Sequence, residues 1–366
     1  MLKIQLSYSL ESARPSLAPI RNPLLDLLHA VREQGSISAA AKAMDLSYRH
    51  VWGELKRWEL LLKHPLIVWE KGQSARLSEF GDKLLWAERQ AQARLSAQIE
   101  ALQADLERAF AVAFDDQAHV LTLYASHDLA LASLREHAQR EHALLLDVRF
   151  GGSVDAIRAL NEGRCQMAGF HTLEQPPKGS RAERSYKPLL KPGQHKILGF
   201  ASRTQGLMVA PGNPLGLRSL NDVMQHQARF VNRGLGSGTR VLLDELLDQS
   251  GLQPEQLQGY ASAEPSHTAV AQSVASGHAD VGLGIEAAAR ERGLDFVPLA
   301  QENYHLVCLK DALELAPVRA LRLVLASAAW QERLSLVPGY TPSQSGEVLA
   351  LRKLLPWWDF KRPKAS

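Results

Sequence analysis

The chain has 366 residues, a formal net charge of +3, 45% hydrophobic residues and 22% charged residues. This composition is typical of a globular protein of two or three domains, and it excludes a fibrous or intrinsically disordered chain. No run of 18 apolar residues occurs, so no membrane-spanning helix is expected. The mild net charge means that a nucleic-acid-binding role would have to rest on a local basic patch.

The two cysteines, Cys165 and Cys308, lie far apart in the sequence and are expected to be buried thiols. Neither a disulfide framework nor a zinc motif is therefore indicated. The N-terminal residues lack the compact apolar core and the cleavage site of a signal peptide. We expect a cytoplasmic protein.

Two short helices joined by a tight turn are expected within residues 35–62, after a helix over Leu24–Gln34. Ser36 and Ser47 are suitable N-caps, because their side-chain oxygens can accept the first free backbone N–H groups of each helix. The second helix has an inward apolar stripe of Val51, Leu55, Trp58 and Leu62. Its other face carries Tyr48, Arg49, His50, Lys56 and Arg57. A helix-turn-helix has this layout, with its second helix in the DNA major groove, although any amphipathic helix pair shares part of the pattern.

A β-hairpin with basic residues near its tip is expected after the helix pair. Leu66–Glu70 is a β-like run, Lys71–Ser74 a turn, and Ala75–Leu77 the returning run. A winged helix carries its wing at this place. The candidate DNA contacts are Ser36, Ser47, Tyr48, Arg49, His50 and Lys56, together with Lys71, Ser74 and Arg76 of the wing.

This block resembles the winged helix-turn-helix of LysR-type regulators and, more closely, that of ModE-type molybdate regulators. The residues that carry the resemblance are Gly35–Ser38, Ala40–Lys42, Leu46–Tyr48, Val51-Trp52, the wing, and Leu77-Ser78 with Gly81. Trp52 and Tyr48 stand where many LysR-type proteins have serine and glutamine, so the recognition face departs toward the ModE pattern. The resemblance implies a transcription regulator that binds double-stranded DNA.

A long helix is expected from the cap Ser78 to about Ala113, since no proline or glycine interrupts it after Gly81. One apolar stripe runs along most of it, formed by Leu84, Ala91, Leu95, Ile99, Leu102, Leu106 and Phe110. An isolated helix of this length needs a partner for its stripe. The stripe could pack on its own chain, but the resemblance implies that this helix pairs two subunits, in a homodimer or a tetramer.

Strands alternate with helices from residue 119 onward, which predicts a parallel-type α/β architecture with ligands at the carboxyl ends of the strands. The expected strands are His119–Ala125, Leu144–Phe150, Gln166–His171, Ile197–Ala210, Arg229–Asn232, Ala279–Leu283, Phe296–Leu299 and Tyr304–Leu309. The expected helices are Leu129–Gln139, Ser153–Glu162, Leu220–His226, Thr239–Gln249, His267–Ser276, Ile285–Arg292, Pro317–Ser327 and Gly346–Leu354. The polar segment Glu174–Arg184 is expected to be a loop between the third and fourth strands. The extended segment Ile197–Ala210 is expected to cross between two lobes.

The most informative loop, Asn232–Arg240, lies between a strand and a helix and contains three glycines. Glycines let the backbone approach a ligand closely, and the free N–H groups at a helix start attract anions. The candidate ligands are Ser237, Gly238, Thr239 and Arg240. No lysine follows the last glycine, so this is not a P-loop, and the glycine spacing does not fit a dinucleotide-binding fingerprint.

Other strand-to-helix junctions also carry a hydroxyl residue near the start of a helix. They add Ser126, Ser153 and Ser266 as candidate ligands, with His171 and His267 beside them. Each junction alone could be an ordinary N-cap, and each histidine could be structural. Several together indicate hydroxyls and amides that converge on a small oxyanion. Catalysis is not indicated, because the consecutive Ser126, His127 and Asp128 cannot form a nucleophile–base relay and no paired metal-ligand spacing occurs. We expect no enzyme, no metal site and no cofactor other than an effector anion.

Residues 119–360 resemble the periplasmic-binding-protein-like domain of molybdate- or tungstate-related regulators. The matching motifs are Phe230–Arg233, Gly236–Arg240, Ala168–His171, Val209–Pro214, Asp280–Gly284, Gly339-Tyr340, Gly346-Glu347 and Pro356–Trp358. The resemblance implies three parts: a winged helix-turn-helix of α+β class over residues 1–77, a dimerisation helix over 78–114, and a two-lobed α/β effector domain over 115–366.

We therefore expect a DNA-binding regulator that senses molybdate or tungstate and controls genes of oxyanion uptake or of enzymes that use these metals. Arg240 would also suit a monoanion, so formate or another small carboxylate is the alternative effector. A different class of function, an oxyanion store or carrier that does not act on DNA, disagrees with the basic recognition face.

Overall fold

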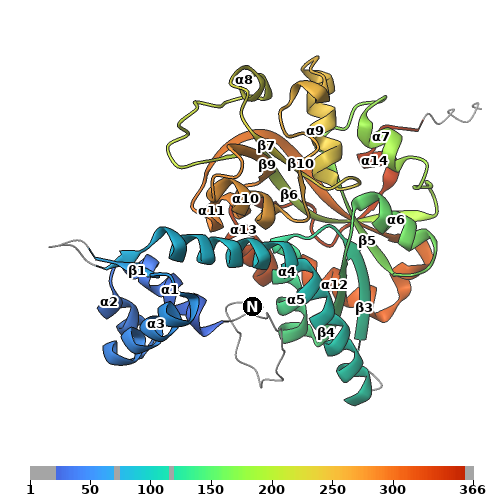
Figure 1. The fold of residues 1–366 in the computed structure, drawn as a ribbon. Coiled ribbons are helices and arrows are strands. Elements are labelled where there is room, and N and C mark those ends of the chain that lie inside the picture. Colours follow the sequence, from blue (N-terminus) through green and yellow to red (C-terminus); the bar gives the residue numbers. More distant parts are fainter. Residues whose placement is uncertain (1–21, 70–74, 115–118, 359–366) are drawn as a thin grey trace, which may run out of the picture. The chain divides into compact units, whose positions relative to one another are not determined.

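The computed structural model describes residues 22–69, 75–114 and 119–358. The chain divides into two compact units, residues 1–96 and 97–366. The first unit contains the helices α1 to α3, a small hairpin and the start of α4, and the second unit contains all later elements (Figure 1).

The first unit is a helix-turn-helix followed by a β-hairpin. Its elements are α1 (Pro23–Gln34), α2 (Ile37–Ala43), α3 (Tyr48–Leu62), β1 (Ile67–Val68) and β2 (Arg76–Leu77). Both predicted N-caps are confirmed, since Ser36 Oγ accepts the Ala39 N–H at 3.1 Å and Ser47 Oγ accepts the His50 N–H at 3.1 Å. Buried apolar side chains from every element form one core, and the antiparallel strands pair Ile67 with Leu77.

The helix α4 (Glu79–Phe114) has 36 residues and confirms the predicted long helix. Ser78 caps it, because its Oγ accepts the Gly81 N–H at 3.0 Å. Part of the predicted apolar stripe is exposed to solvent: Leu102 is 55% exposed and Phe110 43% exposed. Exposed leucine and phenylalanine on one helix face are consistent with a surface that is buried only in an oligomer.

The second unit is a two-lobed α/β domain built on one mixed sheet, with strand order β4-β3-β5-β10-β6-β9-β7-β8. Lobe I contains β3 (His119–Ala125), α5 (Leu129–His142), β4 (Leu144–Phe150), α6 (Ser153–Asn161), β5 (Met167–Leu173) and α7 (Arg181–Tyr186). Lobe II contains α8 (Leu220–Gln225), β7 (Phe230–Arg233), α9 (Gly238–Gln249), β8 (Ala263–Glu264), α10 (His267–Ala275), β9 (Val281–Ile285) and α11 (Glu286–Glu291).

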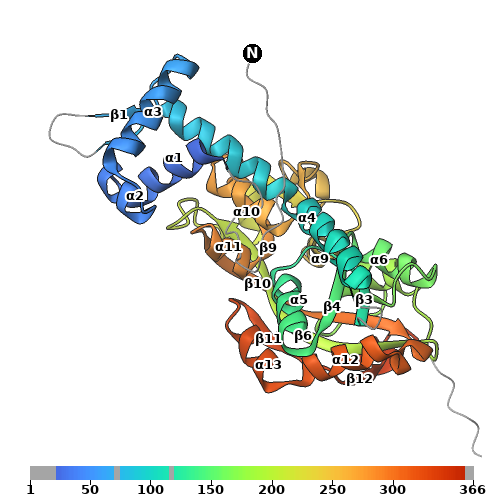
Figure 2. The ribbon, with the colours of Figure 1, turned by 90° about the horizontal axis from the view of Figure 1, so that it is seen from below.

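Two 15-residue strands, β6 (His195–Val209) and β10 (Asp295–Leu309), run antiparallel to each other through both lobes. The chain then returns to lobe I through α12 (Ala316–Ala326), α13 (Ala328–Ser335), β11 (Tyr340–Pro342), β12 (Val348–Ala350) and α14 (Leu351–Leu354). Figure 2 shows α12 and α13 beside α5 at the lobe I end of this unit. The predicted crossing of Ile197–Ala210 is thus confirmed, and so is the two-lobed α/β class.

Four details of the sequence prediction are wrong. The sheet is mixed, because β6 and β10 run against their neighbours. The strands expected at Phe296–Leu299 and Tyr304–Leu309 are one strand with two register shifts. The loop expected at Glu174–Arg184 contains the start of α7, which Ser180 caps. The helix expected at Gly346–Leu354 is wrong in its first part, because Val348–Ala350 form β12, which pairs with β6, and only the four residues of α14 are helical.

Among the residues that the structure describes, no helix has both the length and the apolar character needed to cross a membrane.

Candidate functional site

The predicted recognition face lies on the surface of the first unit. Tyr48 is 51% exposed, and Arg49 and His50 follow it as exposed residues in the first turn of α3. Ser36 and Ser47 use their hydroxyls to cap α2 and α3. Of the predicted wing residues, Arg76 is exposed on β2, whereas Lys71 and Ser74 lie outside the described residues.

The Lys56 side chain contacts two tryptophan rings and a carboxylate of the first unit. Its Nζ lies 4.7 Å from the Trp52 ring centroid and 5.6 Å from that of Trp69, and it forms an ion pair with Glu59 at 2.5 Å. The other oxygen of Glu59 accepts the backbone N–H groups of Leu66 and Ile67 at the start of the hairpin, at 2.8 and 3.1 Å. Lys56 thus helps to hold the hairpin on α3.

The two lobes of the second unit meet at glycines. A Cβ added to Gly152 of lobe I would lie 2.6 Å from the Gly236 carbonyl oxygen of lobe II. A Cβ added to Gly238 would lie 2.8 Å from His171 Cδ2 and 3.2 Å from Ser153 Oγ. These glycines let the backbones of the two lobes approach each other closely.

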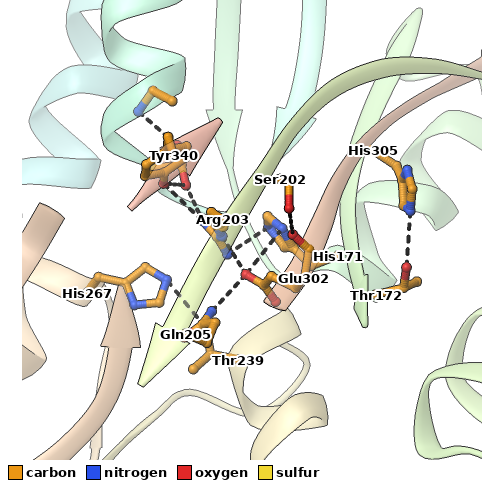
Figure 3. Close-up of polar contacts among 12 residues, drawn as sticks. His171, Thr172, Ser202, Arg203, Gln205, Thr239, His267, Glu302, His305 and Tyr340 are labelled. Atoms are coloured by element: carbon orange, nitrogen blue, oxygen red, sulfur yellow. Dashed lines mark hydrogen bonds and ion pairs between the residues drawn. The ribbon is translucent and has the colours of Figure 1, made fainter. Parts of the chain in front are cut away.

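A cluster of buried polar side chains lies where the lobes meet, and we call it the cleft cluster (Figure 3). It contains Asp128, His171, Arg203, Gln205, Arg233, Thr239, His267 and Glu302. Arg203 of β6 donates to Asp128 and Glu302, and Tyr340 lies 3.3 Å from its Nη1.

Gln205 continues the hydrogen-bond network of the cleft cluster into lobe II. Its Nε2 donates to Glu302 at 2.9 Å and to Thr239 Oγ1 at 3.1 Å. Thr239 Oγ1 in turn lies 3.4 Å from His267 Nε2. The network therefore links both crossing strands to the first turns of α9 and α10.

Arg233, at the end of β7, differs from Arg203 in its partners. It is 3% exposed, its Nη1 lies 3.5 Å from the Glu264 carbonyl oxygen, and its Nε has no hydrogen-bond partner among the described residues. Burial, reinforced by the nearby positive Arg203, lowers the pKa of the Arg233 guanidinium to about 9. A buried cation without a hydrogen-bonded carboxylate is unfavourable, and an anion bound beside it would offset that cost.

The two cluster histidines are neutral donors or acceptors. Burial, with the positive Arg203 and Arg233 nearby, lowers the pKa of His171 and of His267 well below the usual value. In the described part of the chain, His267 Nδ1 and Ser126 Oγ have no hydrogen-bond partner.

Several helices begin at this junction of the lobes. Asp128, Ser237 and Ser266 cap α5, α9 and α10, and Ser153 is the fully buried first residue of α6. Ser237 Oγ accepts the Arg240 N–H at 3.2 Å and donates to the Gly234 carbonyl at 2.8 Å, so this hydroxyl is used within its own loop. Helix starts carry partial positive charge, which favours an anion between them.

Arg240 is engaged elsewhere in lobe II. Its Cζ lies 3.7 Å from the Tyr260 ring centroid, its Nη1 donates to the Tyr260 carbonyl at 3.2 Å, and its Nε lies 3.6 Å from Asp244. The sequence pattern indicates Arg240 as the anion ligand, because it follows the glycines. The arginine that the fold brings into the cleft cluster is Arg233, which directly precedes them.

A cavity of about 10 Å³ borders the cleft cluster, with His171 and Glu302 in its lining, and has room for about one water molecule. Over the described residues, no group of three or more histidine, cysteine, aspartate or glutamate side chains is arranged to hold a metal ion.

Comparison with known families defines the class of protein. The profile of the PBP superfamily domain matches residues 134–326, and that of the bacterial regulatory helix-turn-helix protein, lysR family, matches residues 23–82. The chain belongs to the PBP superfamily, and it is a LysR-type transcriptional regulator with a small-molecule effector-binding domain. Regulators of this type bind DNA and small-molecule effectors and act as oligomers.

Individual relatives are similar over different parts of the chain. The uncharacterized protein YvgK of Bacillus subtilis (strain 168) is 30% identical over 227 residues, which are 62% of this chain and 73% of that protein. An uncharacterized protein encoded beside a ferredoxin gene of Clostridium pasteurianum is 33% identical over 110 residues, 30% of this chain and 97% of that one. A cysteine mutant of OxyR from Corynebacterium glutamicum has a similar structure with a TM-score of 0.41 and 16% identity, covering 86% of this chain and 92% of that one.

Proposed function

We propose that this LysR-type regulator senses a small oxyanion, with molybdate or tungstate favoured, which binds in the cleft cluster between the lobes. The observation that carries the proposal is Arg233, a buried cation whose Nε has no hydrogen-bond partner among the described residues. Within the described part of the chain, His267 Nδ1 of the cluster and Oγ of the buried Ser126 also have no hydrogen-bond partner. Together these groups are suited to the oxygens of a small anion.

The charges of the cluster favour an anion over a neutral effector. Arg203 is already matched by hydrogen-bonded carboxylates of Asp128 and Glu302, whereas Arg233 donates no hydrogen bond to a carboxylate of the residues that the structure describes. The surrounding donors are hydroxyls and helix starts, which suit a tetrahedral oxyanion. Formate or another small carboxylate is the second candidate, because one arginine also suits a monoanion.

The anion would act by stabilising one arrangement of the lobes. A ligand shifts a conformational equilibrium only by its difference in affinity for the two states, and a ligand held by both lobes binds the closed state better. In an oligomer paired through α4, closure would alter the placement of the recognition helices. We propose that residues 1–77, 78–114 and 115–366 carry DNA binding, pairing and sensing, and that the DNA sites are pseudo-palindromes with half-sites about 10 bp or a multiple apart.

Calorimetric titration of the full chain with molybdate, tungstate, sulfate and formate tests this proposal. Replacing Arg233→Gln should weaken binding of the preferred anion by about tenfold or more, because a charged hydrogen bond to the ligand is lost. The matched control is Arg240→Gln, which removes an arginine of the same loop that is engaged by Tyr260. Equal losses in the two variants, or no loss in Arg233→Gln, would contradict the proposed site.

Formate binding without molybdate or tungstate binding would identify the alternative effector. An oxyanion store or carrier without DNA function is the remaining alternative. Loss of operator binding and of the regulatory phenotype in an Arg49→Ala variant would exclude it, and an unchanged phenotype would support it.

A further inference from the structure

The helix α7 joins the two lobes at the edge of the cleft. It belongs to lobe I, because Ala182 and Tyr186 pack in the same buried core as Phe170 and Trp357. It lies beside α9, whose Leu243 belongs to the core of lobe II (Figure 1). The polar segment Glu174–Arg184, predicted to be a loop, includes the first residues of α7.

Ion pairs and a backbone hydrogen bond join α7 to α9, beside the apolar packing of Val241 on the core of lobe I. The Arg181 guanidinium donates to both carboxylate oxygens of Asp248, at 2.6 and 2.9 Å, and Arg184 lies 3.7 Å from the same carboxylate. The Arg181 backbone N–H donates to Glu245 Oε2 at 2.5 Å. The Arg181 and Asp248 side chains are 44% and 42% exposed, whereas Glu245 is only 7% exposed.

The helices α7 and α9 also line the small cavity that borders the cleft cluster. Pro177, Ser180 and Ala182 line the cavity from the α7 side, and Val241 and Glu245 line it from α9. His171 and Glu302 of the cleft cluster line it as well. The segment of α7 therefore covers one edge of the cleft, and the cleft cannot widen there unless α7 separates from α9.

We propose that α7 is a latch: Arg181, with Glu245 and Asp248 as its partners on α9, holds the lobes together and sets how readily the cleft opens to its ligand. These three residues are positioning residues, since they act on the ligand through closure of the lobes. The link to a ligand rests on the proposed function, whereas the effect on opening does not.

The expected size of the effect follows from the exposure of the ion pair. An exposed bidentate pair contributes modestly, so its removal should raise the population of open cleft by about two- to fivefold. Replacing Asp248→Arg should have a larger effect, because it places a third positive charge beside Arg181 and Arg184. Combining Asp248→Arg with Arg181→Asp should restore closure, because the pair is re-formed in reverse.

Hydrogen exchange of the ligand-free full chain measures opening at the first turns of α6 and α9, residues 153–155 and 238–240. We expect exchange there to be about two- to fivefold faster in Arg181→Ala and near the wild-type rate in the charge-swapped variant. The control is Arg229→Ala, which removes a bidentate pair with Asp280 inside lobe II, at 3.0 and 2.5 Å. Faster exchange in α7 alone, or equal exchange in Arg181→Ala and the control, would overturn the latch.

A second arm measures the dissociation rate of molybdate, which should rise in Arg181→Ala by the same factor as the exchange. If the wild-type chain binds no oxyanion, the proposed effector is wrong, but the exchange experiment still decides whether α7 holds the lobes together. An unchanged dissociation rate with faster exchange would limit the latch to the ligand-free protein and overturn its role in ligand retention.

Discussion

Replacing Gly238→Ala should separate the stability of the fold from closure of the cleft. Gly238 is the first residue of α9, and its φ is not in the left-handed region, so alanine fits the local backbone. Alanine in place of glycine stabilises a helix by up to about 1 kcal/mol. The added methyl group, however, would lie 2.8 Å from His171 Cδ2 and 3.2 Å from Ser153 Oγ, both in the other lobe.

Because His171 is buried between the lobes, we expect a contact this short to push the lobes apart. Overpacking of a well-packed interface costs about 1–3 kcal/mol, which corresponds to about 5- to 150-fold in the population of the closed state. Gly238→Ala should therefore leave the melting temperature unchanged or raise it slightly, while it weakens anion binding and speeds hydrogen exchange at the first turn of α6. Most destabilising substitutions lower the melting temperature and the anion affinity together. A lower affinity at an unchanged or higher melting temperature therefore indicates a specific effect on closure.

The assays are calorimetric titration with molybdate, thermal unfolding and hydrogen exchange on the full chain. Gly234→Ala is the matched control, because a Cβ there has no heavy atom within 4 Å and its φ is also outside the left-handed region. Wild-type affinity and exchange in Gly238→Ala, or the same loss in both variants, would refute the closure argument.

Three further predictions concern DNA binding, pairing and pH. Arg49→Ala should lose about 1–3 kcal/mol of operator affinity if Arg49 contacts a base. Lys56→Gln should weaken operator binding without changing the slope of log affinity against log salt concentration. Filter-binding titrations at several salt concentrations measure both effects. Leu102→Glu should weaken subunit pairing by about tenfold or more in sedimentation equilibrium, because it places a charge in the apolar stripe of α4, whereas Gln103→Glu should not. Burial lowers the pKa of His305 to about 4, so the contribution of the neutral imidazole to stability is complete above pH 6.5 and is lost as the pH falls toward 4. Urea unfolding at a series of pH values should show this loss of stability. The pH dependence should be smaller in His305→Asn.

Local features of the fold were predictable because their causes are local in sequence. Ser36 and Ser47 cap helices through residues only three positions away. The 3.6-residue period of apolar side chains likewise predicted α4 almost to its ends. The long strand at residues 295–309 was predicted as two pieces, because the polar run Gln301–Asn303 interrupts its apolar residues.

The cleft cluster was predictable only in part. Its hydroxyls follow strands and precede helices, which is a local signal, and the structure buries the Ser126, Ser153 and Thr239 that this signal indicated. The pairing of Arg203 with Glu302 joins strands whose partners are 99 positions apart, and no short-range pattern reports such a contact. The choice between Arg233 and Arg240 depends on which side of the backbone each side chain leaves, and glycine spacing carries no information about that.

The position of Glu302 on β10 has a mechanical consequence. It lies between the two register shifts of that strand, Pro298/Ala300 and Tyr304/His305, and it pairs directly with Arg203 on β6. Irregular pairing is where a sheet bends most easily. The segment that would flex when the lobes move is therefore the one that carries the charged centre of the cleft. Detection and movement share the same few residues, so a change that retunes what the cleft recognises will also alter how stiffly the lobes are joined.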